Sequence, residues 1–253
     1  MLNYSIQTGF LCNQTLPAHR NSSELPTALL VVSGINVALS ITATLGNALI
    51  LVAFYKESSL NPPSKLFLRC LAFSDLCVGL VVQPLAVLSL SAAFYHRWNF
   101  CRVTELLWYS FSIVVADFSL ATLSAISVDR LLALSLGIRY RQVVTMKRAR
   151  WCVGLILLFS IGNCFTQYRV GIMNFTIKLL WVFAGLMICY LPFGLGLLVQ
   201  TMLSEITEPI LIISFFGLTL VYLNSSMNPL LYCWKIREVR HAVKETLRIF
   251  GFR

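Results

Sequence analysis

Polar side chains lie in the middle of long apolar runs of this sequence. Their burial there costs free energy, so such residues usually have a function. Asp75 lies within Leu66–Phe94, and Asn224 and Asn228 lie within Pro209–Trp234. In hydrocarbon such groups are stable only when they face protein, water or an ion. A carboxylate beside amide oxygens could bind a small cation or exchange a proton. A protonated Asp75, hydrogen-bonded inside a helix bundle, is the structural alternative.

Two further features could bear on a mechanism. Pro229 directly follows Asn228, and a proline inside a helix leaves a backbone carbonyl without its usual partner. Asp129 and Arg130 are adjacent near the end of another apolar run, Leu106–Leu136. They could form an ion pair that ends a helix, or they could meet a partner protein. No nucleophile–base pair or metal-binding set of side chains is evident, so we do not expect an enzyme.

Long apolar segments must position these groups. The chain has 253 residues, of which 58% are hydrophobic and 12% charged, and it is therefore far more apolar than a soluble domain. A membrane-spanning helix needs about 20 apolar residues. We expect an all-α, polytopic membrane helical bundle with about six recognisable apolar segments. These are Thr27–Tyr55, Leu66–Phe94, Leu106–Leu136, the shorter Trp151–Phe165, Leu179–Met202 and Pro209–Trp234.

Basic residues give the expected orientation of the bundle. The net charge of +10 comes largely from two clusters beside apolar runs, Arg139–Arg150 and the stretch after Lys235. This placement follows the positive-inside rule and does not indicate nucleic-acid binding, so both clusters are expected in the cytosol. Val239, Val243 and Leu247 recur at helical spacing. They predict a C-terminal amphipathic helix that lies on the membrane surface.

The N-terminal segment is expected outside the cell. It carries three sites of the glycosylation type, Asn3, Asn13 and Asn21, which are used only on the secretory side of a membrane. The expected organisation is an extracellular glycosylated tail (1–26), a transmembrane bundle (27–234), and a cytosolic amphipathic helix and tail (235–253).

Six motifs occur in order along these segments. They are Gly46-Asn47, Leu71-Ala-Phe-Ser-Asp75, Trp98-Asn-Phe100, Asp129-Arg130, Cys189-Tyr-Leu-Pro192 and Asn228-Pro-Leu-Leu-Tyr232. In this order the chain resembles the rhodopsin-like (class A) G-protein-coupled receptors. The resemblance covers nearly the whole chain, apart from the N-terminal tail and the stretch between about Cys164 and Lys178. It implies a bundle of the seven-transmembrane receptor type in the plasma membrane.

The resemblance also implies roles for particular residues. The family holds an allosteric sodium ion in a polar cluster, which here corresponds to Asn47, Asp75, Ser119, Asn224, Ser225 and Asn228. Its coupling and activation switch corresponds to Asp129, Arg130, Tyr190, Pro192, Pro229 and Tyr232. Its ligand pocket corresponds to Ser112, Asp117, Phe193 and Tyr222. No other cofactor is implied, and membrane lipids surround the bundle.

Departures from the family pattern are informative. Ser112 stands where amine receptors carry an Asp, which argues against an amine ligand held in that way. Cys101 is the candidate for the outer disulfide, with Cys12 and Cys164 as unpromising partners. The fifth helix and the second extracellular loop are not recognisable. Asp117 would normally face neighbours near that helix, and if it were left towards lipid it would cost several kcal/mol or bind a proton.

The shortened chain raises a problem of topology. Six full spans that start outside would place the Asn228–Tyr232 motif on the opposite side from Arg130. Trp151–Phe165 would be only about 22 Å long as a helix, so one solution is that it re-enters the membrane without crossing it. Another is that the chain is a truncated product that folds poorly.

The sequence therefore predicts a receptor that binds an extracellular ligand and signals through a heterotrimeric G protein. One alternative is a truncated, non-signalling decoy. An ion channel or transporter, with Asp75 on the ion path, is a third possibility, although no internal repeat supports it.

Overall fold

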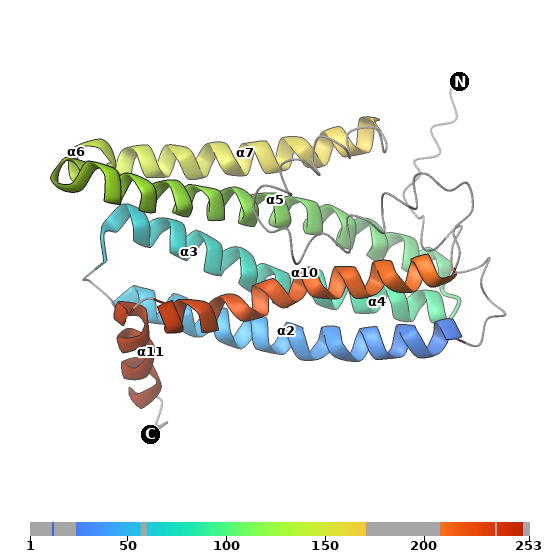
Figure 1. The fold of residues 1–253 in the computed structure, drawn as a ribbon. Helices are drawn as coiled ribbons and strands as arrows, with labels where there is room; N and C mark the ends of the chain where they lie inside the picture. The colour runs from blue at the N-terminus through green and yellow to red at the C-terminus, as the bar shows by residue number, and fades with distance from the viewer. Residues whose placement is uncertain (1–11, 13–23, 57–59, 171–207, 236, 250–253) are drawn as a thin grey trace.

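The computed structural model describes residues 12, 24–56, 60–170, 208–235 and 237–249 (Figure 1). Helices dominate this part of the chain, and it contains no strand, which confirms the all-α prediction. The helices are α2 (Glu24–Lys56), α3 (Pro62–Cys77), the π-helix η2 (Val78–Val82), α4 (Gln83–Phe94), α5 (Trp98–Leu136), the 3-10 helix η3 (Gly137–Arg139), α6 (Tyr140–Val143), α7 (Met146–Val170), α10 (Glu208–Lys235) and α11 (Arg237–Ile249).

Four stretches of the described helices are long and apolar enough to cross a membrane: Thr27–Tyr55, Pro62–Phe94, Trp98–Leu136 and Met146–Phe165. The last of these includes Trp151–Phe165 and is long enough to cross, which argues against the solution in which that segment re-enters the membrane. α7 has 25 residues, or roughly 37 Å of helix, because it includes basic residues before Trp151. The long side chains of such residues can reach the membrane surface from within a helix.

α10 lies beside α2 and runs in the same direction (Figure 1). In the first half of both helices, the Asn36 amide donates to the Thr219 hydroxyl at 3.2 Å. Further along both helices, the Asn47 amide donates to the Ser225 carbonyl at 3.0 Å. α10 is therefore not inverted relative to α5, which also runs parallel to α2 (Figure 1). This arrangement removes the predicted conflict of topology.

The two ends of the bundle can be named from this arrangement. α2, α5 and α10 all finish at one end, which also holds the basic stretch Arg139–Arg150 and α11, and which we call the basic end (Figure 1). We call the other the disulfide end, after the Cys12–Cys101 bond described below. α5 begins there at Trp98. Trp98–Cys101 is thus the first turn of that helix.

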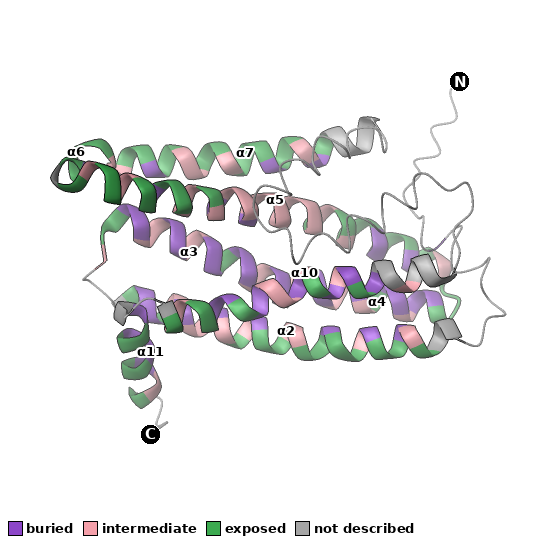
Figure 2. Cartoon of the chain, viewed as in Figure 1, coloured by how far each residue is buried: buried purple, intermediate pink, exposed green. Residues whose placement is uncertain are grey.

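Buried residues concentrate on α3 and α4, in the middle of the bundle, whereas α7 is largely exposed (Figure 2). The π-helix η2 lies immediately before Gln83 and Pro84, at the start of α4. There the Gln83 N–H bonds to the Val78 carbonyl, since the missing N–H of a proline disturbs the regular ladder. At the same turn the Ser40 hydroxyl donates to the Gly79 carbonyl at 2.6 Å.

α11 packs against the basic end of the bundle. Val239 is fully buried, and with Ala242 and Val243 it joins the cluster that contains Ile50 and Phe54 of α2. The Arg240 guanidinium donates to the carbonyls of the last turn of α10, at 2.8 Å to Cys233 and 2.5 Å to Trp234. Carbonyls at a helix end need such partners. The predicted amphipathic helix therefore also stabilises the end of α10.

A substitution at Gly79 tests the close approach of η2 to α2. A Cβ on Gly79 would lie 2.6 Å from the Thr44 hydroxyl oxygen and 2.9 Å from the Thr44 backbone nitrogen. We expect Gly79→Ala to lower the free energy of unfolding by about 1–3 kcal/mol, as overpacking does. Thermal unfolding of the purified protein in detergent measures this loss.

Gly34→Ala is the matched control, because a Cβ on Gly34 meets nothing within 4 Å. It should leave stability unchanged or raise it by up to about 1 kcal/mol. Equal effects of the two substitutions would contradict the packing of η2 on α2.

Candidate functional site

The centre of the site is a hydrogen bond between α3 and α10. Asp75 is fully buried, and its Oδ2 atom accepts from the Asn228 amide at 2.6 Å. Asp75 Oδ1 has no hydrogen-bond partner among the described residues. A buried acceptor of this kind is costly without a partner. The pair leaves an oxygen that a cation, a proton or a water could satisfy.

Asn47 and Pro229 make the second link of the site. Pro229 has no N–H to bond to the carbonyl four residues before it, which is that of Ser225. The Asn47 side-chain amide donates to this carbonyl at 3.0 Å and also to the Ala43 carbonyl at 2.9 Å. The carbonyl freed by the proline, which the sequence predicts, is thus satisfied by the neighbouring helix. Asn47 Oδ1 has no protein partner in the described chain.

Gly46 allows this link to form. A Cβ at Gly46 would come within 2.9 Å of the Pro229 ring, so a larger residue would push α2 and α10 apart. Glycine at this position therefore serves a close approach between two helices.

The remaining residues of the predicted cation site lie on α5 and α10. Ser119 on α5 and Ser225 on α10 are buried, and Asn224 is half-buried. The described hydrogen bonds join Asp75 to Asn228, and Asn47 to Ser225. The Tyr232 hydroxyl, one turn further along α10, is buried without a hydrogen-bond partner in the part of the chain described.

Asp129 is held in a polar cluster at the basic end. Its carboxylate accepts from the Ser64 hydroxyl at 2.6 Å and from the Tyr140 hydroxyl at 2.5 Å. Burial raises the pKa of the Tyr140 phenol, and its bond to the Asp129 carboxylate raises this pKa further. Asp129 is buried and the adjacent Arg130 is exposed. The carboxylate is therefore bound by hydroxyl groups of α3 and α6, and the guanidinium is left on the surface.

Sequence reasoning missed both hydroxyl partners of Asp129. Ser64 follows the two prolines at the start of α3, and Tyr140 lies eleven residues after Asp129. Neither position carries a pattern that singles it out, because the contact depends on how α3, α5 and α6 meet.

The predicted ligand-pocket residues are divided between several elements. The Tyr222 hydroxyl on α10 accepts from the indole N–H of Trp108 on α5 at 2.7 Å, and Ser112 lies one turn beyond Trp108. Trp108 was not predicted, and it also lines a small cavity with Asn36, Ser89 and Phe215. Phe193, like Tyr190 and Pro192 of the predicted switch, lies outside the described residues.

Asp117 has a partner on α7. The Asn163 amide donates to its Oδ2 atom at 3.2 Å. The alternative in which this carboxylate is left towards lipid is therefore excluded, because α7 packs against α5 and brings Asn163 alongside it.

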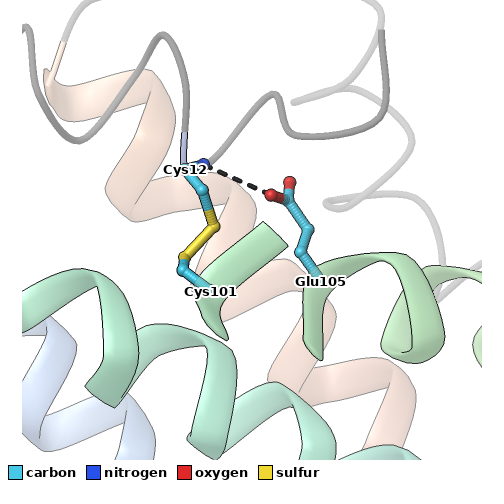
Figure 3. Close-up of side chains that lie close together, drawn as sticks. All are labelled: Cys12, Cys101 and Glu105. Carbon is cyan, nitrogen blue, oxygen red and sulfur yellow. Dashed lines mark hydrogen bonds between the residues drawn. A yellow bond between two sulfur atoms is a disulfide. The ribbon is translucent and has the colours of Figure 1, made fainter. Parts of the chain in front are cut away.

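A disulfide joins Cys12 to Cys101 across 89 positions of sequence (Figure 3). Cys12 was an unpromising partner from the sequence, and the structure corrects that view. The Cys12 N–H also donates to the Glu105 carboxylate at 3.3 Å. Cys12 is buried in an apolar cluster with residues of α2, α4 and α10, among them Leu29, Leu90 and Phe215.

The glycosylation sites Asn3, Asn13 and Asn21 lie outside the described residues.

Cys12, Cys101 and Glu105 lie close enough together to hold a metal ion. Because the two sulfurs are bonded to each other, we interpret the cluster as a covalent tether.

Comparison with known proteins identifies related chains. Residues 46–176, just over half of the chain, match the family described as 7 transmembrane receptor (rhodopsin family). Adenosine receptor A2b of Bos taurus is 34% identical over 138 residues, which are 54% of this chain and 40% of that receptor. 5-hydroxytryptamine receptor 1B of Equus caballus is 27% identical over 161 residues, which are 64% of this chain and 40% of that receptor. The chain thus matches about two fifths of the length of these relatives.

Removal of the tether provides a test of the disulfide end. Cys12→Ser should lower the free energy of unfolding by about 2–4 kcal/mol, as the loss of a disulfide closing a long loop does. Cys101→Ser should cause the same loss, and the double substitution should add little. Thermal unfolding measures the loss, and peptide mapping without reductant identifies the linked pair.

Cys152→Ser is the control, since Cys152 is a free, half-buried thiol. A link between Cys101 and any cysteine other than Cys12 in the peptide map would contradict the observed pairing. So would equal stability of Cys12→Ser and Cys152→Ser.

Proposed function

This chain belongs to the 7 transmembrane receptors of the rhodopsin family, and we propose on that premise that it binds an extracellular ligand and signals through a heterotrimeric G protein. The observation that carries the proposal is the arrangement at the basic end. Asp129 is held by Ser64 and Tyr140 beside an exposed Arg130. α10 and α11 finish at the same end (Figure 1).

We propose that the basic end faces the cytosol and that the N-terminus is extracellular, in the plasma membrane. The positive-inside rule supports this orientation, because Arg139–Arg150 and α11 carry the clustered basic residues. The Cys12–Cys101 disulfide supports it as well, since disulfides persist on the oxidising side of a membrane and this one lies at the opposite end. On this orientation, residues 1–26 are an extracellular tail, 27–234 the bundle, and 235–253 a cytosolic helix and tail.

The proposed switch breaks contacts at the basic end. A ligand shifts a two-state equilibrium only if it binds one state more tightly. In the proposed active state, Arg130 contacts the G protein, and the buried Tyr232 hydroxyl gains the partner that it lacks here. Pro192 would bend the sixth helix and Tyr190 would respond to ligand, both as the family resemblance implies. Pro229 supplies the second local irregularity, in α10.

The proposed ligand site lies between α5 and α10 towards the disulfide end. The hydrogen bond between Trp108 and Tyr222 supports it, because it links the two helices at the level of Ser112. We include Asp117 and Phe193 in the proposed ligand site because the family resemblance implies that they line the pocket. Ser112 in place of a carboxylate argues against an amine held at that position.

We propose sodium as an allosteric ligand of the central cluster. Asp75 Oδ1 and Asn47 Oδ1 are buried acceptors without protein partners in the described chain, and hard cations prefer oxygen ligands. Ser119, Asn224, Ser225 and Asn228 would supply the neighbouring polar groups. The bound ion would stabilise the ionised form of Asp75 and so favour the state in which α3 and α10 are joined.

Arg130→Ala tests the proposed coupling. Without the guanidinium, ligand-stimulated second-messenger production in cells should fall at least tenfold, whereas surface expression should stay unchanged because Arg130 is exposed. Arg102→Ala, at the disulfide end and also exposed, is the matched control and should signal normally.

Three other results would count against this assignment. Full signalling by Arg130→Ala would exclude the proposed role of that residue. A wild-type chain that reaches the surface and never signals would favour the decoy. A ligand-gated macroscopic current would favour the channel or transporter.

Asp75→Asn tests the sodium site without any signalling assay. In wild-type protein, replacing choline chloride with sodium chloride at equal ionic strength should raise stability by about 1.4 kcal/mol at tenfold excess over the dissociation constant. The substitution removes the charge that binds the ion, and so it should abolish this difference. Thermal unfolding measures it.

Asp117→Asn is the control carboxylate, since it lies on α5 and bonds to Asn163. It should keep the sodium effect. Equal sodium stabilisation of the wild type and Asp75→Asn would contradict the assigned site.

A further inference from the structure

A groove opens at the basic end, between the beginnings of α3 and α7. Its volume is about 280 Å³, and it is lined by Leu60, Pro62, Lys65, Leu66, Arg69 and Met146. Neither the cluster around Asp75, nor the proposed ligand site, nor the Asp129 cluster uses any of these residues.

The groove combines positive charge with an apolar surface. Lys65 and Arg69 are its two charged lining residues, and the described lining contains no carboxylate. Arg69 Nη2 donates to the Phe54 carbonyl at 2.7 Å, which fixes the guanidinium at the groove wall. A guanidinium has five N–H donors, so this bond leaves further donors for a ligand.

The surroundings add to the positive potential. Lys147 and Arg150 are exposed on the first turns of α7, directly after Met146. α3 and α7 both begin at the groove, and the start of a helix carries partial positive charge. An anion in the groove would therefore interact with fixed charges on two helices.

An anionic phospholipid matches this combination. On the proposed orientation the groove lies at the cytosolic leaflet, where anionic lipids are found and where basic pockets between helices bind their head groups. A lipid phosphate would interact with Lys65 and Arg69, and the start of an acyl chain would lie along the apolar lining residues Leu60, Leu66 and Met146. A purely ionic ligand would leave this apolar wall unused.

We propose that Lys65, Arg69 and the apolar wall formed by Leu60, Leu66 and Met146 make a binding site for one anionic phospholipid. The inference rests on insertion in a membrane in the orientation proposed above, and not on the identity of the receptor's ligand or on G-protein coupling. Its failure would therefore leave the proposed receptor function untouched.

Native mass spectrometry of the purified full chain in detergent tests the site. Titration with phosphatidylserine should show one tightly bound molecule, and phosphatidylcholine with the same acyl chains should bind at least fivefold more weakly. Lys65→Gln should weaken phosphatidylserine binding about fivefold, since one basic residue near a lipid surface contributes about that factor. Lys65→Arg keeps the charge and should keep the binding.

Arg97→Gln is the matched control, because it removes the same charge from an exposed position at the disulfide end. It should change phosphatidylserine binding less than twofold. Equal losses in Lys65→Gln and Arg97→Gln would overturn the site in favour of non-specific attraction. So would equal affinity for the two lipids.

Glycerophosphoserine, the same head group without acyl chains, separates a lipid from a soluble anion. It should bind at least tenfold more weakly than phosphatidylserine, and equal affinity would overturn the assignment to a lipid. If Lys65→Gln does not fold, Met146→Glu takes its place. This substitution sets a carboxylate in the groove and should abolish the preference for phosphatidylserine, and retention of that preference would reject the site.

Discussion

The bundle depends on one backbone carbonyl that its own helix cannot satisfy. Pro229 removes the N–H that would bond to Ser225, and an unpaired carbonyl is expensive in a medium without water. Asn47 satisfies it from α2 at 3.0 Å, and Gly46 makes room for the proline ring at the same level. Because the donor and the acceptor lie on different helices, the hydrogen bond that satisfies this carbonyl also attaches α10 to α2. The direction and register of the last helix follow from this attachment.

The same attachment brings Asn228 to Asp75. Asn228 immediately precedes the proline and meets α3, whereas Ser225 meets α2 one turn earlier. One helical turn of α10 therefore contacts two neighbours with two different polar groups. Each contact leaves a buried oxygen unpaired within the described chain, Asp75 Oδ1 and Asn47 Oδ1. A packed but incompletely satisfied polar centre of this kind suits a small ligand or a second conformation better than it suits maximum stability.

Much of this could be predicted from the sequence, because burying a polar group in an apolar helix leaves a visible pattern. Asp75, Asn228 and the carbonyl freed by Pro229 were identified in that way. Contacts set by chain geometry were not. The Cys12–Cys101 bond spans 89 positions, and the Tyr140–Asp129 bond requires the turn of α6. The length of α7 was underestimated because the apolar run begins only at Trp151. The helix already begins at Met146 and includes basic residues whose long side chains can reach the membrane surface.

The two ends of the molecule are held by different kinds of bond, and this difference determines where it can move. At the disulfide end, a covalent link and the apolar cluster around Cys12 join the start of α5 to α2, α4 and α10. At the basic end, Asp129 is held by two hydroxyl groups, and such bonds exchange readily with water or a partner. α5 can therefore separate from α3 and α6 at the basic end without the breaking of a covalent bond, whereas α11 remains packed on α2 there through the cluster around Val239. In the proposed receptor, a signal that enters near the disulfide end would emerge at the basic end, where Arg130 is exposed.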